Sequence, residues 1–334
     1  MVKLSKPTKG VKKMKKLLCF ILSLILSMTI IVGCDKKDDL NNESSKAATA
    51  SAEDFTYEKN EDGGITIKKY IGDIAHVQIP DEIDSLPVTT LGYQCFKKSK
   101  ILKSVVIPDT VTTIKADAFL ECSLLESVVF SQNLKTIEAN AFQHCKALAK
   151  IDLPESLVII AGQAFFGCVS LEEIAIPKNV KTLAHNVFGH CEFKSIVFLG
   201  EPETIGGAAF ANNPYIEQIV LPNSVKNIEN IAFANCENLK KIVLNEGLIS
   251  IGDSAFRRNP NLTEIVIPKT VETINETAFL ECPALKSVKF EGNAPAEYKS
   301  EKGNADYPEY TVYYHDGAKG FTSPEWCGYK TEKW

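Results

Sequence analysis

The 334-residue sequence lacks the short motifs that accompany common catalytic sites. It contains no G-x-S-x-G, no H-E-x-x-H, no phosphate-binding P-loop and no G-x-G-x-x-G. Only five histidines are present, and the sequence alone pairs none of them with an acidic or serine partner. Because catalysis needs dissimilar groups brought together at one place, we expect a binding protein that has no enzymatic activity, no cofactor and no metal.

Basic residues are scarce beyond the first 33 positions. Residues 1–33 hold seven lysines and no acidic residue, so the remainder has 30 basic and 42 acidic side chains, a net charge of −12. Nucleic-acid backbones are bound by clustered Lys and Arg. The acidic remainder therefore argues against nucleic acid as a partner.

The lysine-rich start is followed by an uncharged apolar run, residues 17–32, which at 16 residues is short of the roughly 20 that a spanning helix needs. This arrangement is typical of an export signal. The run ends in Ile31-Val32-Gly33-Cys34, which resembles the lipobox of bacterial lipoproteins, with Ile31 in place of the more usual Leu. The resemblance implies cleavage of residues 1–33 and lipidation of Cys34, which would anchor the chain to the bacterial cell membrane, facing outward. An uncleaved membrane anchor and a simple secretory signal are the alternatives.

The rest of the chain is dominated by an internal repeat. A polar segment without aromatic residues, within residues 34–55, is predicted to be a flexible tether. Farther along, an Ala/Val-Phe pair recurs every 23 residues, with one step of 22. The phenylalanines are Phe119, Phe142, Phe165, Phe188, Phe210, Phe233, Phe256 and Phe279. A fixed period in the twenties is typical of a leucine-rich repeat.

Each repeat position has a physical role. In the unit that begins at Leu102, Val105 and Ile107 alternate as in a strand and are predicted to point into the core. Pro108 ends the strand because it offers no N–H to a strand ladder. Val111 and Ile114 form the next inward pair, and Phe119 fills the centre of the coil.

The pattern I-P-x-x-V-x-x-I-x-x-x-A-F-x-x-C resembles the BspA-like (Treponema-type) leucine-rich repeat over roughly residues 64–334. The resemblance implies a mainly β solenoid of about 23 residues per coil, with a parallel sheet on one face and short strand, turn or 3-10 segments on the other. We expect an N-terminal cap and divergent first repeat over 56–100, the solenoid over 101–290, and a C-terminal aromatic cap over 291–334. Terminal coils of such arrays need caps because they would otherwise expose their cores.

A column of small side chains follows the phenylalanines at the end of each coil. Its members are Cys122, Cys145, Cys168, Cys191, Asn213, Cys236, Asn259 and Cys282. Parallel side chains about 5 Å apart do not favour disulfide geometry, and exchange with Asn indicates a structural ladder that serves backbone groups. Metal or redox chemistry, suggested by His144 and His190 beside two of the cysteines, is the alternative. Cys95 and Cys327 are expected to be unpaired thiols.

A second column points outward from the predicted strands and is mostly valine. Its members are Val106, Val129, Asp152, Ala175, Val197, Val220, Val243 and Val266. One interpretation is strand propensity, since valine suits any strand. The other is a partner-binding face, because contiguous exposed apolar surface marks interaction sites.

The C-terminal aromatic residues offer a competing site. They are Tyr310, Tyr313, Tyr314, Phe321, Trp326, Tyr329 and Trp334. Such residues stack on sugar rings, but they also make good lids for a core. The leading hypothesis is a cell-surface lipoprotein that binds a host, extracellular-matrix or envelope protein, as the BspA-like resemblance implies. The alternative is a protein that binds carbohydrate or cell wall through these aromatics.

Overall fold

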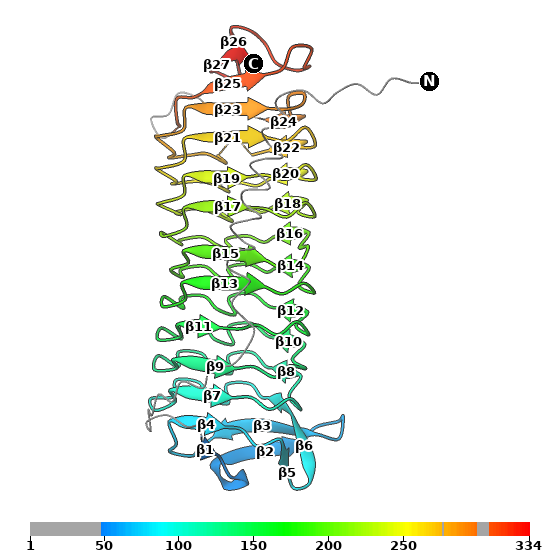
Figure 1. The fold of residues 1–334 in the computed structure, drawn as a ribbon, viewed down its shortest axis with the longest axis vertical. Coiled ribbons are helices and arrows are strands. Elements are labelled where there is room, and N and C mark those ends of the chain that lie inside the picture. The colour runs from blue at the N-terminus through cyan, green and yellow to red at the C-terminus, as the bar shows by residue number, and fades with distance from the viewer. Residues whose placement is uncertain (1–47, 276, 299–306) are drawn as a thin grey trace, which may run out of the picture. The chain divides into compact units, whose positions relative to one another are not determined.

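The computed structural model describes residues 48–275, 277–298 and 307–334, all within the second of two compact units, residues 46–334. In this unit the chain winds as a solenoid of stacked coils (Figure 1). Each coil has three sides: a strand on a first face, a shorter strand on a second face, and a turn side that carries the repeated phenylalanine. The mainly β solenoid with parallel sheets confirms the predicted fold class.

The strands of the first face stack in one column, in parallel, with equivalent repeat positions side by side (Figure 1). They are β1 (Ala48–Thr49), β4 (His76–Gln78), β7 (Ser104–Val106), β9 (Ser127–Val129), β11 (Lys150–Ile151), β13 (Glu173–Ile176), β15 (Ser195–Phe198), β17 (Gln218–Val220), β19 (Lys241–Val243), β21 (Glu264–Ile267), β23 (Ser287–Phe290), β25 (Thr311–Tyr314) and β27 (Tyr329–Lys333).

The second face carries mostly two-residue strands, also parallel and in register. They are β3 (Ile65–Tyr70), β6 (Leu86–Leu91), β8 (Thr113–Ile114), β10 (Thr136–Ile137), β12 (Ile159–Ile160), β14 (Thr182–Leu183), β16 (Thr204–Ile205), β18 (Asn227–Ile228), β20 (Ser250–Ile251), β22 (Thr273–Ile274) and β24 (Glu297–Tyr298). From β6 to β22, the inward Ile or Leu of each strand is buried, whereas the residue before it faces outward.

The turn side is also hydrogen-bonded from coil to coil. The Phe119 N–H donates to the Ala141 carbonyl at 2.7 Å, and the Glu121 N–H donates to the Gln143 carbonyl at 2.8 Å. Most coils place two residues of this side in the left-handed region, as Asp117 (φ 58°) and Glu121 (φ 56°) do. Asn, Asp and His tolerate that region best among residues other than glycine, so polar residues recur there.

The phenylalanines form a continuous stack inside the solenoid. From Phe96 to Phe279, successive ring centroids lie 4.8–5.9 Å apart with nearly parallel planes. The single step of 22 residues has a local cause. The turn from Cys191 to Phe193 is one residue shorter than the turn from Cys168 to Leu171, and the larger Phe193 is fully buried, 5.8 Å from Phe188.

The N-terminal end begins earlier than predicted. Residues 48–55, assigned above to the tether, form β1, a 3-10 helix η1 (Ala52–Asp54) and the start of β2 (Phe55–Lys59). They are held because Ala50 and Phe55 are buried against the first coil. β2 pairs with β3 in antiparallel fashion, and β5 (Glu82–Ile83) pairs with β6, so that antiparallel strands close this end.

The C-terminal end also departs from the predicted boundary at residue 290. β24 continues the second face, and β25 and β27 add two further parallel strands to the first face. The closing element is β26 (Glu325–Trp326), which pairs with β27 in antiparallel fashion. The predicted cap is therefore largely a continuation of the solenoid, because its residues keep the strand register after the repeat pattern has faded.

One boundary between coils is weaker than the others in the described residues. Neither β11 and β13 nor β12 and β14 are joined by a backbone ladder. The Phe165 and Phe188 coils remain joined on the turn side, where the Phe165 N–H donates to the Val187 carbonyl at 3.0 Å. Asp152 follows β11, and because Asp is depleted in strands it keeps that strand to two residues.

Ile231 provides a test of the turn-side geometry. It occupies a left-handed position (φ 52°) that Asn140 and Asn186 fill in other coils, and β-branched residues are strained there. We expect Ile231→Asn to raise the free energy of unfolding by about 1 kcal/mol, measured by urea denaturation. Ile249→Asn is the matched control, because Ile249 is equally exposed, at 39%, in an ordinary backbone conformation. A gain of similar size in the control would contradict this explanation.

Candidate functional site

Most of the outward column of the first face lies in solvent. Val129 is 56% exposed, Val197 and Val220 are each 46% exposed, and Val243 is 38% exposed. Val106 and Val266 are partly buried, whereas Asp152 and Ala175 are exposed. Strand register makes these positions neighbours, as for Val106 and Val129, Ala175 and Val197, and Val220 and Val243.

The weak coil boundary divides this column into two parts. A hollow of about 660 Å³ lies there on the first face, lined by Lys150, Asp152, Glu173, Ala175 and Val197 among others. Lys150 and Asp152 form an ion pair at 3.3 Å with both side chains at least 80% exposed. The longer apolar stretch therefore runs from Val197 to Val266.

The charged side chains beside the valines pair with one another across coils. Nζ of Lys194 lies 2.8 Å from the Glu172 carboxylate, and the hydrogen bond to Glu172 raises the pKa of Lys194. Lys240 pairs with Glu217 at 3.1 Å in the same way. Exposed pairs such as these add little to stability, because solvent screens them. Their effect here is that neighbouring charges of opposite sign cancel, which leaves the valines as the distinctive feature of this face.

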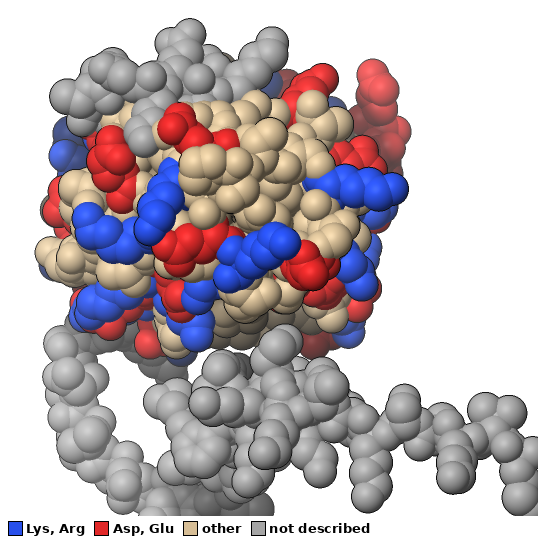
Figure 2. All heavy atoms as spheres, turned by 90° about the horizontal axis from the view of Figure 1, so that it is seen from above, with Lys and Arg blue, Asp and Glu red and all other residues tan. Residues whose placement is uncertain are grey.

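Acidic and basic side chains also alternate elsewhere on the solenoid. Seen from above, the C-terminal end in Figure 2 shows blue and red side chains interspersed among uncharged ones. The described surface in this view forms no field of one sign.

Sequence reasoning missed Tyr215, which lies just before β17 and is 46% exposed. It borders a hollow of about 640 Å³ together with Lys194, Gln218 and Lys241. The signal was present in the sequence, because Tyr215 is the one aromatic residue at a position filled elsewhere by Ile101, Leu124, Ala147, Ser170, Asn238, Asn261 and Ala284.

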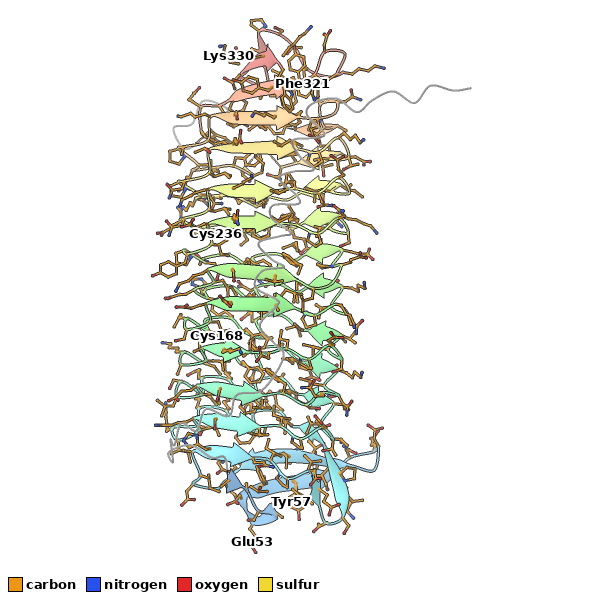
Figure 3. The ribbon with its side chains drawn as sticks, in the orientation of Figure 1. Glu53, Tyr57, Cys168, Cys236, Phe321 and Lys330 are labelled. Carbon is orange, nitrogen blue, oxygen red and sulfur yellow. The ribbon has the colours of Figure 1, made fainter. Side chains whose placement is uncertain are left out.

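The cysteine column lies inside the solenoid on its turn side. Each Sγ donates to the carbonyl of the phenylalanine in the preceding coil, as for Cys122 to Phe96 (3.0 Å) and Cys168 to Phe142 (3.2 Å; Figure 3 labels Cys168). The other cysteine contacts span 3.0–3.4 Å. Asn259 makes the equivalent contact through Nδ2 to the Phe233 carbonyl at 3.0 Å.

Burial governs the chemistry of these thiols. It raises the pKa of Cys122, Cys168, Cys236 and Cys282 to about 12 and that of Cys145 and Cys191 well above the usual value. The eight cysteines of the described residues, including Cys95 and Cys327, are all free.

His144 and His190 lie two coils apart with the Phe166 ring between them. The ring centroid of Phe166 is 5.4 Å from that of His144 and 4.9 Å from that of His190. Nε2 of His190 lies 3.0 Å from Nδ2 of Asn212, and burial lowers the pKa of His190. In the described part of the chain, no three His, Cys, Asp or Glu side chains are grouped so that they could hold a metal ion.

Most of the C-terminal aromatic residues belong to the core. Trp326 is only 7% exposed and packs against Tyr298, Phe290 and Phe321, with ring centroids 4.7–5.8 Å apart. Tyr310, Tyr314 and Tyr329 are buried as well. Trp334, by contrast, is 48% exposed, stacks on His315 and lies beneath Nζ of Lys289. This burial argues against sugar stacking on Trp326.

The predicted lipidation site, Cys34, and the predicted signal, residues 1–33, lie outside the described residues. Within the described residues, no helix has the length and apolar character needed to span a membrane.

The sequence matches the profile of the BspA type leucine rich repeat region, in six copies, over residues 89–217 and 203–299. No curated protein sequence matches significantly. A leucine-rich repeat protein from Bacteroides ovatus is similar in structure, with 26% identity and a TM-score of 0.64 over 78% of this chain and 70% of that one. The leucine-rich repeat protein of T. pallidum has 27% identity and a TM-score of 0.50 over 64% of this chain and 91% of its own.

The buried thiols give a prediction about chemical reactivity. Thiolates are the reactive form, and burial raises the pKa of every column cysteine far above its usual value. These cysteines should therefore stay unmodified at pH 8 in the folded unit of residues 46–334. We expect a disulfide-exchange reagent to titrate at most two thiols, Cys327 first, and all eight after denaturation. Fewer than eight in denaturant would reveal disulfides and contradict the free-thiol ladder.

Proposed function

Because the chain belongs to the BspA-type leucine-rich-repeat family, we propose that it is an exported, surface-attached protein that binds a partner protein through the first face of its solenoid. The observation that carries this proposal is the exposed apolar column of Val197, Val220 and Val243. We refer to these three residues as the valine patch.

Several physical features support a protein as the occupant. Contiguous exposed apolar surface is uncommon on soluble proteins unless it serves an interaction. Strands fixed by ladders on a rigid solenoid lose little conformational entropy on binding, so more of the contact energy is retained as affinity.

The charges narrow the kind of partner. Lysines and glutamates of the first face neutralise one another in pairs such as Lys194 with Glu172 and Lys240 with Glu217. A polyanion would need an excess of positive charge that these pairs do not supply. The partner that fits is a folded protein with an apolar strip bordered by charges of both signs, either extracellular-matrix material or another envelope protein.

The binding proposal can be tested with paired substitutions. In the unit of residues 46–334, Val220→Glu with Val243→Glu places two charges on the valine patch while keeping the strands. Against an array of purified extracellular-matrix proteins, with surface plasmon resonance on any that bind, we expect a Kd at least tenfold weaker, because a desolvated unpaired charge opposes association.

The matched control is Thr204→Glu with Asn227→Glu, which adds two charges to neighbouring strands of the second face. Circular dichroism melting should show both double variants folded. The proposal is contradicted if the control loses binding while the Val220→Glu, Val243→Glu protein retains it. That result would place the binding site outside the valine patch.

Attachment through Cys34 is the second part of the proposal, and it rests on the lipobox-like residues 31–34. In a bacterial host, the full chain should partition into the detergent phase of Triton X-114, and its N-terminal peptide should begin at an acylated Cys34. Cys34→Ser should leave residues 1–33 uncleaved and remove the acyl mass, as measured by mass spectrometry. A soluble mature protein without acyl mass would instead indicate a simple secretory signal.

A further inference from the structure

The second face contains a groove that the valine patch does not involve. Two adjoining hollows, of about 410 Å³ and 640 Å³, share Asn230, Ser250 and Gly252. Together they extend along the solenoid from His185, just after β14, to Glu297 in β24. With strands spaced roughly 4.8 Å apart, the groove is on the order of 24 Å long.

One repeat position contributes Glu229, Gly252 and Asn275 to the lining of the groove. The residue after the inward Ile of each second-face strand is Gly206, Glu229, Gly252 and Asn275 in successive coils. A Cβ on Gly206 would lie 2.2 Å from the Leu183 carbonyl oxygen, and one on Gly252 would lie 2.8 Å from the Asn230 nitrogen. Neighbouring backbones thus approach so closely that no side chain fits at these two glycines. In the alternate coils, the longer side chains of Glu229 and Asn275 border the groove.

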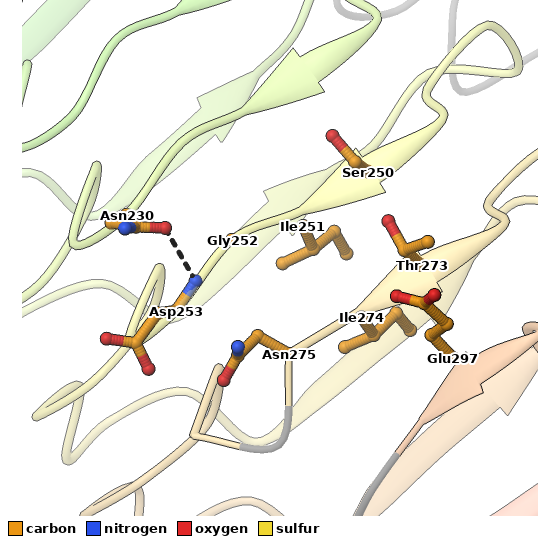
Figure 4. A pocket seen from close by; sticks show the side chains of 9 residues that line it. All are labelled: Asn230, Ser250, Ile251, Gly252, Asp253, Thr273, Ile274, Asn275 and Glu297. Carbon is orange, nitrogen blue, oxygen red and sulfur yellow. Dashed lines mark hydrogen bonds between the residues drawn. The ribbon is translucent and has the colours of Figure 1, made fainter.

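Polar side chains line the part of the groove nearest Glu297 in two rows. Figure 4 shows Ser250, Thr273 and Glu297 on one side, and Asn230, Asp253 and Asn275 on the other. The first row is in register, because Ser250 pairs with Thr273 and Thr273 with Glu297. The side chains of Ile251 and Ile274 are buried, so backbone forms the floor between the rows.

Backbone contacts fix some of these groups and leave others available. Oδ1 of Asn230 accepts the Asp253 N–H at 3.0 Å, and Oδ1 of Asn275 accepts the Thr277 N–H at 3.1 Å. Each amide is thereby oriented, while its Nδ2 has no partner among the described residues. The Thr273 hydroxyl and the Glu297 carboxylate also have no hydrogen-bond partner among the described residues. The groove therefore offers oriented donors beside acceptors.

We propose that this groove binds a segment of a neutral, linear polysaccharide. Sugar hydroxyls both donate and accept hydrogen bonds, so a polymer of them matches donors and acceptors that alternate along a groove. Glu229, Asp253 and Glu297 line it without any Lys or Arg, which repels anionic polymers. A peptide could not add as a strand, because β18, β20 and β22 are each paired on both sides and strand addition needs a free edge.

The test uses the unit of residues 46–334 and linear hexamers of glucose, mannose and N-acetylglucosamine, with hexagalacturonate as the anionic comparison. Ligand-detected NMR titration should show binding of at least one neutral hexamer and none of hexagalacturonate. Thr273→Met, which fills the groove and removes a hydroxyl, should weaken the neutral hexamer at least tenfold.

Thr136→Met is the matched control. Thr136 has the same repeat position in a two-residue Thr-Ile strand of an earlier coil, outside the groove, so its variant should bind like the unmodified protein. The proposal is overturned if no neutral hexamer binds at millimolar concentration, if Thr273→Met binds unchanged, or if hexagalacturonate binds best. Because the valine patch is untouched by either variant, this result is independent of protein binding on the first face.

Discussion

The stacking of one phenylalanine on the next is the contact on which the rest of this structure depends. Rings 4.8–5.9 Å apart from Phe96 to Phe279 set a coil spacing that β-sheet hydrogen bonding also requires. At that spacing the thiol of Cys168 reaches the carbonyl of Phe142, and Val220 lies beside Val243. Both strand ladders are missing between the Phe165 and Phe188 coils, but the turn-side hydrogen bonds continue there and the two rings lie 5.6 Å apart. The ring stack and the turn side therefore join the coils where the sheets do not.

The regular part of the fold could be predicted because it repeats. Phe119 and its equivalents give the period, and Pro108 and its equivalents end the strands. The exchange of Cys with Asn at one repeat position indicates, from sequence alone, a column of side chains that hydrogen-bond to the backbone. Residues 311–314 and 329–333 could not be assigned to coils in this way. They keep strand alternation but have lost the Ile-Pro and Ala-Phe markers, so only register with β23 places them in the first face.

The candidate sites, unlike the fold, depend on residues that depart from the repeat. A side chain present in every coil offers the same surface everywhere and cannot mark one place. Tyr215 is the aromatic exception at its position, and Asp152 is the acidic exception in the valine column. Gly252 lines the groove between coils that carry Glu229 and Asn275 at the same repeat position. Sequence reasoning detected Asp152 but not the groove, because a glycine between longer residues borders a hollow only once the coils are stacked.

The two candidate sites share coils but not surface. The strand of Val220 and the strand that precedes Glu229 belong to one coil, with the buried Ile219, Ile228 and Phe233 between its faces. A packed interior of this kind does not deform continuously. A ligand bound to one face therefore does not change the structure of the other face. A protein on the valine patch and a polysaccharide in the groove would therefore bind independently, with additive free energies. For a surface-attached protein this arrangement means that one solenoid can join a polymer to a protein without either excluding the other.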